Sequence, residues 1–172
     1  MDPQVVRYSE RPELWDGLGG LSAEVWPEYN LHGETLNYYW VQLYDVFPEW
    51  QFVLFDPQDE TVLAEGHTVP VAWDGTDAGL GPGIDATMAA AFELRSADGR
   101  PTAVSALAAE IPPRHQGKRL SGKLLRAMAG LGREAGDYVF PAGLSTVHID
   151  RDRDLGEYWE PNVWIIHPPT SG

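Results

Sequence analysis

A short basic segment in an otherwise acidic chain has the residue types of an anion-binding site. Residues 109–125 read AEIPPRHQGKRLSGKLL, so an apolar run meets two prolines, then a polar turn, then a helix-like pattern. The first N–H groups of a helix lack intrahelical partners, and the helix dipole adds partial positive charge there. Gly117 lets an anion approach the backbone closely, and basic side chains surround it. The segment therefore predicts a binding site for a diphosphate.

Eight residues of this segment are expected to contact the anion or the molecule that carries it. They are Ile111, Arg114, Gln116, Gly117, Lys118, Arg119, Leu120 and Ser121. His115 lies in the same turn and contacts either the anion or only solvent. An ordinary strand–turn–helix corner with a solvated basic face has the same composition, so that interpretation stays open. The spacing fits neither the phosphate loop of nucleoside triphosphatases nor the GxGxxG dinucleotide fingerprint.

The charge balance of the whole chain bears on its partners. The 172 residues include 26 acidic and 12 basic side chains, which gives a net charge of −14. Such a field disfavours nucleic acid and favours a cationic partner such as an amine, although solubility alone would also explain it. With no cysteine in the chain, disulfides, thiolate metal sites and a cysteine nucleophile are excluded.

The same composition bears on location and metals. The N-terminus has no basic region followed by an apolar run, and no stretch approaches the ~20 apolar residues of a membrane span. We therefore expect a cytoplasmic protein that does not enter membranes. The alternating charges at residues 150–154 lack the glycine and distal glutamate of a calcium loop, and no metal site is expected.

The elements that must position the basic turn predict one α/β domain over residues 1–172. Strands are expected at 4–8, 51–55, 61–73, 102–111 and within 138–149, with an apolar strand-like tail at 158–167. Helices are expected at 35–47, 85–95 and 120–135, and another after Ser9 with Leu14, Leu18, Leu21 and Val25 on one face. Gly66 suggests a bulge in the strand at 61–73.

The helix at 120–135 has the clearest pattern in the chain. Its apolar residues repeat at helical spacing and predict one buried face: Leu120, Leu124, Met128, Leu131 and Ala135. Gly136 suits the position just after a helix. This element fixes where the basic turn ends and the helix N-terminus begins.

The turn and its flanking elements resemble the acyl-CoA signature of the GNAT acetyltransferase superfamily. Residues 114–119 (RHQGKR) are similar to the motif Q/R-x-x-G-x-G/A, with Arg119 at the place of the second glycine. The resemblance implies a GNAT-like mixed, mostly antiparallel central sheet flanked by helices, with a C-terminal half shorter than in the family. Residues 69–77, 101–121 and 158–167 are also similar to an uncharacterised actinobacterial acetyltransferase-like group.

The resemblance implies direct acyl transfer from acetyl-CoA to an amine, without a metal. The thioester would lie between two strands that splay apart, and the acceptor would be a small, cationic molecule. Glu110 is the candidate base, since apolar neighbours would bury it and raise its pKa, and Tyr138 is the candidate acid. Each has an ordinary alternative: Glu110 faces solvent or pairs with an arginine, and Tyr138 only packs in the core.

Further candidates border the same region. His67 either faces the cleft or is merely hydrogen-bonded within its strand. An aromatic acceptor pocket near the early helices would be built from Trp26, Tyr29, Tyr38 and Tyr39. The apolar tail would allow a homodimer through strand pairing. Two other classes stay open: a non-catalytic GNAT-like protein that binds an acyl-CoA or a partner, and an unrelated α/β binding module.

Overall fold

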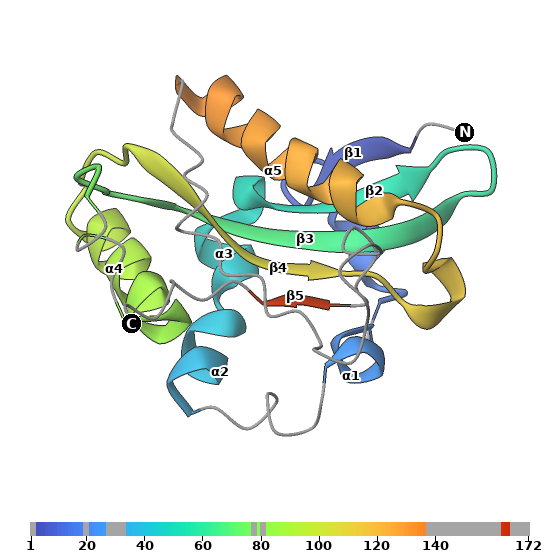
Figure 1. Cartoon of the computed structure of the whole chain (residues 1–172), viewed down its shortest axis with the longest axis horizontal. Helices are drawn as coiled ribbons and strands as arrows, with labels where there is room; N and C mark the ends of the chain where they lie inside the picture. The colour runs from blue at the N-terminus through green and yellow to red at the C-terminus, as the bar shows by residue number, and fades with distance from the viewer. Residues whose placement is uncertain are drawn as a thin grey trace.

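The chain folds into a five-stranded sheet covered by helices on both faces, as Figure 1 shows. The computed structural model describes residues 3–18, 21–26, 34–76, 79, 82–136 and 163–165. Within these residues no helix is long and apolar enough to cross a membrane.

The strands follow one another across the sheet in chain order. They are β1 (Gln4–Arg7), β2 (Gln51–Asp56), β3 (Thr61–Val71), β4 (Ala103–Glu110) and β5 (Val163–Ile165). Every neighbouring pair is antiparallel. The predicted α/β fold with a mostly antiparallel sheet is therefore confirmed. The tail strand β5 pairs with β4 of the same chain, and its partner in the sheet is thus intramolecular.

Gly66 on β3 serves the packing of an aromatic ring. Phe52 lies opposite Gly66 on β2, and a Cβ on this glycine would lie 2.3 Å from Phe52 Cζ. The ring therefore lies across the glycine. The bulge predicted at Gly66 is not found there: the register shifts leave Leu63 of β3 and Leu107 of β4 as the extra residues. β2 is buried throughout, so β2 and β3 form the centre of the core.

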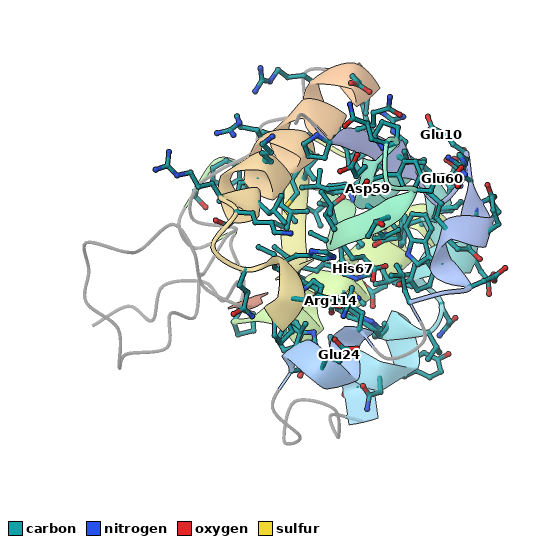
Figure 2. All side chains as sticks on the ribbon, turned by 90° about the vertical axis from the view of Figure 1, so that its right-hand side faces the viewer. Glu10, Glu24, Asp59, Glu60, His67 and Arg114 are labelled. Carbon is teal, nitrogen blue, oxygen red and sulfur yellow. The ribbon has the colours of Figure 1, made fainter. Side chains whose placement is uncertain are left out.

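The longest helix covers one face of the sheet. α5 (Leu120–Gly136) packs on β3 and β4, and the short helices α1 (Leu21–Val25) and α2 (Glu34–Trp40) lie on the other side, as both views show (Figures 1 and 2). α4 (Ile84–Ser96) packs against β3 and α2. α5 buries Leu120, Leu124, Met128 and Leu131 as predicted. Ala135 is exposed instead, because the last turn of α5 extends beyond its buried contacts.

Two predicted helices are wrong in extent. The segment after Ser9 forms a 3₁₀ turn at Pro12–Trp15 and only later α1, and the Ser9 N–H bonds to the Pro48 carbonyl. The predicted helix at 35–47 divides into α2 and α3 (Leu43–Val46). The Gln42 side chain donates to the Tyr38 carbonyl at 2.6 Å, which replaces a backbone donor in the last turn of α2.

Candidate functional site

A pocket of about 180 Å³, counting the space open to solvent, lies where β4 ends and α5 begins. Its lining residues are Ile111, His115, Gln116, Gly117, Lys118, Arg119, Leu120 and Ser121. Seven of the eight residues predicted for anion binding thus surround one pocket, and His115 completes the set. The start of α5 directs the partial positive charge of a 17-residue helix to this place.

The turn has a backbone that favours glycine at two positions. Gly117 has φ +74°, and Arg119 has φ +58°. In the left-handed region a residue with a Cβ is strained, whereas glycine is not. Arg119 therefore keeps a glycine-type backbone conformation while adding a guanidinium at the edge of the pocket.

His115 and Lys118 contribute polar groups to the pocket. Lys118 Nζ donates to His115 Nδ1 at 3.2 Å, because an ammonium group has no lone pair to accept with. The imidazole proton therefore lies on Nε2, which is shielded from solvent and has no partner among the described residues. Burial, then the charges of Lys118 and Arg114, lower the pKa of His115. The neutral ring thus keeps an N–H donor on Nε2 that has no partner among the described residues.

Arg114 is separate from the other predicted residues. Its Nη1 lies 2.8 Å from Glu24 Oε2 of α1, and both side chains are about half exposed. Figure 2 shows this pair bridging the turn after β4 and the helix on the far side of the sheet. Arg114 therefore ties the turn to α1 and does not line the pocket.

A second polar cluster lies on β3 and β4, among aromatic residues of the segments that precede β2. Glu65 and Glu110 face each other across the two strands, and His67 lies two residues after Glu65 on the same face. All three side chains are buried. Like charges directly opposite in a sheet are destabilising, so the arrangement is unfavourable for folding alone. Glu110 is the residue before Ile111, which lines the pocket.

Aromatic donors surround the two carboxylates. Tyr44 donates its hydroxyl to Glu65 Oε1 at 2.8 Å, and the Trp15 indole N–H donates to the same oxygen. The Trp26 indole N–H donates to Glu110 Oε1 at 2.5 Å. These donors come from three separate segments that precede β2. The N-terminal part of the chain is therefore bonded to the centre of the sheet.

The orientation of His67 is fixed by Gln51. The Gln51 amide nitrogen donates to the carbonyls of Phe47 and Thr68 at 3.1 and 3.0 Å, so its oxygen must accept from His67 Nδ1, 3.0 Å away. The Nε2 atom of His67 is then unprotonated, and it has no hydrogen-bond partner among the described residues. Trp40 packs on the ring with centroids 4.8 Å apart.

Burial shifts the titration of this cluster. It raises the pKa of Glu65 to about 7, opposed by the hydrogen bonds from Tyr44 and Trp15. It lowers the pKa of His67, opposed by the charge of Glu110. Burial and the neighbouring Glu65 carboxylate raise the pKa of Tyr44. Burial therefore favours the neutral forms of both His67 and Glu65.

The other sequence candidates have mixed outcomes. Trp26 reaches the cluster, whereas Tyr38 is 65% exposed and Tyr39 packs on Phe92 of α4. The predicted acceptor pocket thus does not form around the tyrosine pair. Tyr138 and Tyr29 lie outside the described residues.

Sequence reasoning missed Glu65 and Gln51. Glu65 had a readable signal, because a strand places residues i and i+2 on one face, and His67 was already a candidate. Gln51 had none, since its role depends on the register between β2 and β3.

Comparison with known proteins agrees with the fold. No protein-family model matches the chain, and no curated protein matches it in sequence. The chain is similar to a solved structure of the GNAT-like decarboxylase GphF in complex with isobutyryl-CoA, with a TM-score of 0.56 and 17% sequence identity. The match covers 78% of this chain and 62% of that one, so the chain spans less than two thirds of its neighbour. The fold is therefore GNAT-like.

Proposed function

We propose that this protein binds acetyl-CoA at the start of α5 and transfers its acetyl group to an amine of a small molecule. The observation that carries the proposal is the pocket at residues 111–121, where a helix N-terminus, a left-handed turn and basic side chains meet. These features suit a diphosphate. The GNAT-like fold of a protein solved with isobutyryl-CoA supports a ligand of this class.

Glu110 is the proposed base for the transfer. The acceptor amine must lose a proton as it attacks the thioester, and a carboxylate beside the pocket can take that proton directly or through water. Glu110 is buried, it directly precedes the pocket-lining residue Ile111 in the chain, and the Trp26 N–H donates to one of its oxygens. The C–N bond then forms, the C–S bond breaks, and a proton returns to the CoA thiolate. Tyr138 remains the proposed donor of that proton.

A carboxylated acyl-CoA is a second candidate substrate. The decarboxylase named in the structural comparison favours it, as does a buried acid–base cluster. In this reaction the C–C bond to the carboxylate breaks, carbon dioxide leaves, and the α-carbon takes up a proton. A protein that binds acyl-CoA without converting it is the remaining alternative.

Binding of acetyl-CoA is tested first. A ligand that binds only the folded state raises the melting temperature, and at 100 times its Kd the gain is about 2.7 kcal/mol. We expect such a rise in the wild type and none in Gly117→Trp, whose side chain would fill the turn. The control Lys123→Ala removes a charge of α5 outside the pocket lining. Its rise in melting temperature with acetyl-CoA should be closer to that of the wild type. Equal shifts in the wild type and Gly117→Trp would refute the site.

Conversion is tested next with Glu110→Gln. Thiol release from acetyl-CoA is followed with a panel of amines, and carbon dioxide release with carboxylated acyl-CoAs. We expect Glu110→Gln to slow transfer about 10²-fold or more without weakening acetyl-CoA binding. An unchanged rate would remove Glu110 from the mechanism. Carbon dioxide release without transfer would select decarboxylation, and ligand binding without either product would select the non-catalytic alternative.

A further inference from the structure

The cluster of Glu65, His67 and Glu110 directs three acceptor atoms toward one another inside the protein. His67 Nε2 lies 3.6 Å from Glu65 Oε1 and 4.0 Å from Glu110 Oε1. Because Gln51 accepts from Nδ1, the Nε2 atom presents a lone pair to both carboxylates. Lone pairs and anionic oxygens repel one another in a buried place, so a proton or a metal ion that neutralises them would stabilise the cluster.

The separations between His67 Nε2 and the two carboxylates are longer than a hydrogen bond and leave room for a metal ion. A proton shared by two of these atoms needs a heavy-atom distance near 2.7–3.2 Å. One ligand atom from each residue lies within 4.8 Å of the other two. A cation equidistant from atoms at such separations would lie roughly 2.0–2.5 Å from each, which is the range of metal–ligand bonds in proteins.

Hydrogen bonds from the surroundings offset part of the effect of burial on these carboxylates. Tyr44 and Trp15 donate to Glu65, and Trp26 donates to Glu110. A donor to a carboxylate oxygen stabilises its charged form. The bond from His67 Nδ1 to Gln51 fixes the tautomer that a metal requires. An outer layer that orients the ligands in this way is typical of metal sites.

We propose that Glu65, His67 and Glu110 bind one divalent first-row transition-metal ion, such as Zn²⁺ or Mn²⁺. One imidazole nitrogen with two carboxylate oxygens suits these ions, whereas Mg²⁺ and Ca²⁺ prefer oxygen alone. This proposal differs from the expectation, drawn from the sequence, of a protein without a metal site. The inference goes beyond acyl transfer: a cation on Glu110 occupies the lone pairs that a base needs, so the metal-loaded protein should be the slower transferase.

The test measures metal uptake by the full chain. The protein is purified, treated with a chelator, dialysed and titrated with Zn²⁺ and with Mn²⁺ by calorimetry, and the retained metal is counted by mass spectrometry. We expect one ion per chain. Co²⁺ should give a visible absorption spectrum typical of mixed nitrogen and oxygen ligation.

Two variants remove ligands in different ways. His67→Gln removes the nitrogen, and Glu65→Gln keeps an oxygen that can accept from Tyr44 and Trp15 while removing the charge. Each should weaken metal binding at least 10-fold. His115→Asn, which removes a histidine of the turn, should keep the wild-type stoichiometry. Circular dichroism checks that each variant is folded. If His67→Gln does not fold, Glu65→Gln alone tests the site.

Two outcomes would overturn the proposal. The first is a wild type that takes up no metal, which would mean that protons alone neutralise the cluster. The second is unchanged metal affinity in both folded variants. Gly117→Trp should lose acetyl-CoA binding and still bind the metal. Glu65→Gln should bind the metal more weakly and still bind acetyl-CoA. Failure of the metal site and failure of the acyl-CoA site are therefore told apart.

Discussion

Arg119 shows how one residue combines backbone strain with a charge suited to the pocket. Its φ of +58° belongs to a conformation in which glycine is unstrained, and its side chain is exposed at the pocket. A left-handed non-glycine residue costs about 1 kcal/mol or more. The GNAT signature has glycine or alanine at this place, so the chain combines the turn of the signature with an additional guanidinium.

Arg119→Gly and Arg119→Ala separate the charge from the strain. Both should weaken acetyl-CoA binding roughly 10-fold, since one hydrogen bond to a charged group is worth about 1.5 kcal/mol. Arg119→Ala keeps the strain, so its free energy of unfolding should be about 1 kcal/mol below that of Arg119→Gly. It should therefore unfold at a lower urea concentration. Calorimetry and urea denaturation measure the two effects. Wild-type affinity in Arg119→Gly would mean that the guanidinium points away from the ligand.

His115 predicts a pH dependence of ligand binding. Burial, then Lys118 and Arg114, hold the pKa of His115 below its usual value in the free protein. A bound diphosphate favours the imidazolium and raises that pKa, so binding takes up a proton. Affinity for acetyl-CoA should therefore rise as pH falls from 8 toward 6. Calorimetry in buffers of different ionisation enthalpy measures the proton uptake, and the same profile in His115→Asn would contradict the assignment.

Among the elements, those with a strong repeating pattern were predicted from the sequence and the short ones were not. The 120–135 helix, the 51–73 hairpin and the strand at 102–111 follow from apolar periodicity and turn residues. The segment after Ser9 and the 35–47 segment have helical spacing too, yet neither forms one continuous helix: the Ser9 N–H bonds to the distant Pro48 carbonyl, and the Gln42 side chain bonds to the Tyr38 carbonyl. Apolar spacing does not encode such tertiary contacts.

Alanine substitutions at two glycines in regular elements should change the free energy of unfolding in opposite directions. Gly130 lies within α5, and a Cβ there meets nothing within 4 Å, so Gly130→Ala should stabilise the protein by about 0.8–1 kcal/mol. Gly66→Ala should destabilise it by about 1–3 kcal/mol, because its Cβ would overlap the Phe52 ring. Thermal unfolding measures both changes. A stable Gly66→Ala would mean that the ring moves freely from its place over β3.

In the molecule as a whole, one main apolar core holds the site. Leu124 and Met128 of α5, Phe52 of β2 and Met88 of α4 belong to the same cluster of buried residues. The pocket and the Glu65–His67–Glu110 cluster lie at the border of that core. The anion turn was predictable because its chemistry is local in sequence, whereas the polar cluster joins residues more than forty positions apart and depends on strand register.

Stability should therefore depend on the core far more than on surface ion pairs. Phe52 is fully buried, so Phe52→Ala should cost about 3–5 kcal/mol. Arg7 pairs with Glu134 and joins β1 to α5 with the Glu134 side chain 67% exposed, so Arg7→Ala should cost less than about 1 kcal/mol. Urea denaturation measures the free energy of unfolding of both variants, provided that its dependence on urea concentration has the same slope in each. Similar costs would mean that the ion pair anchors α5 more strongly than its exposure indicates.

The indole bonds of Trp15 and Trp26 have a consequence for observing this protein. Each ring donates its N–H to a carboxylate of the buried cluster, and Trp40 packs on its histidine. Indole emission responds to charge close to the ring. The cluster therefore carries its own optical probes, and a change in occupancy at Glu65 or Glu110 would alter the colour or yield of light emitted from the unlabelled chain.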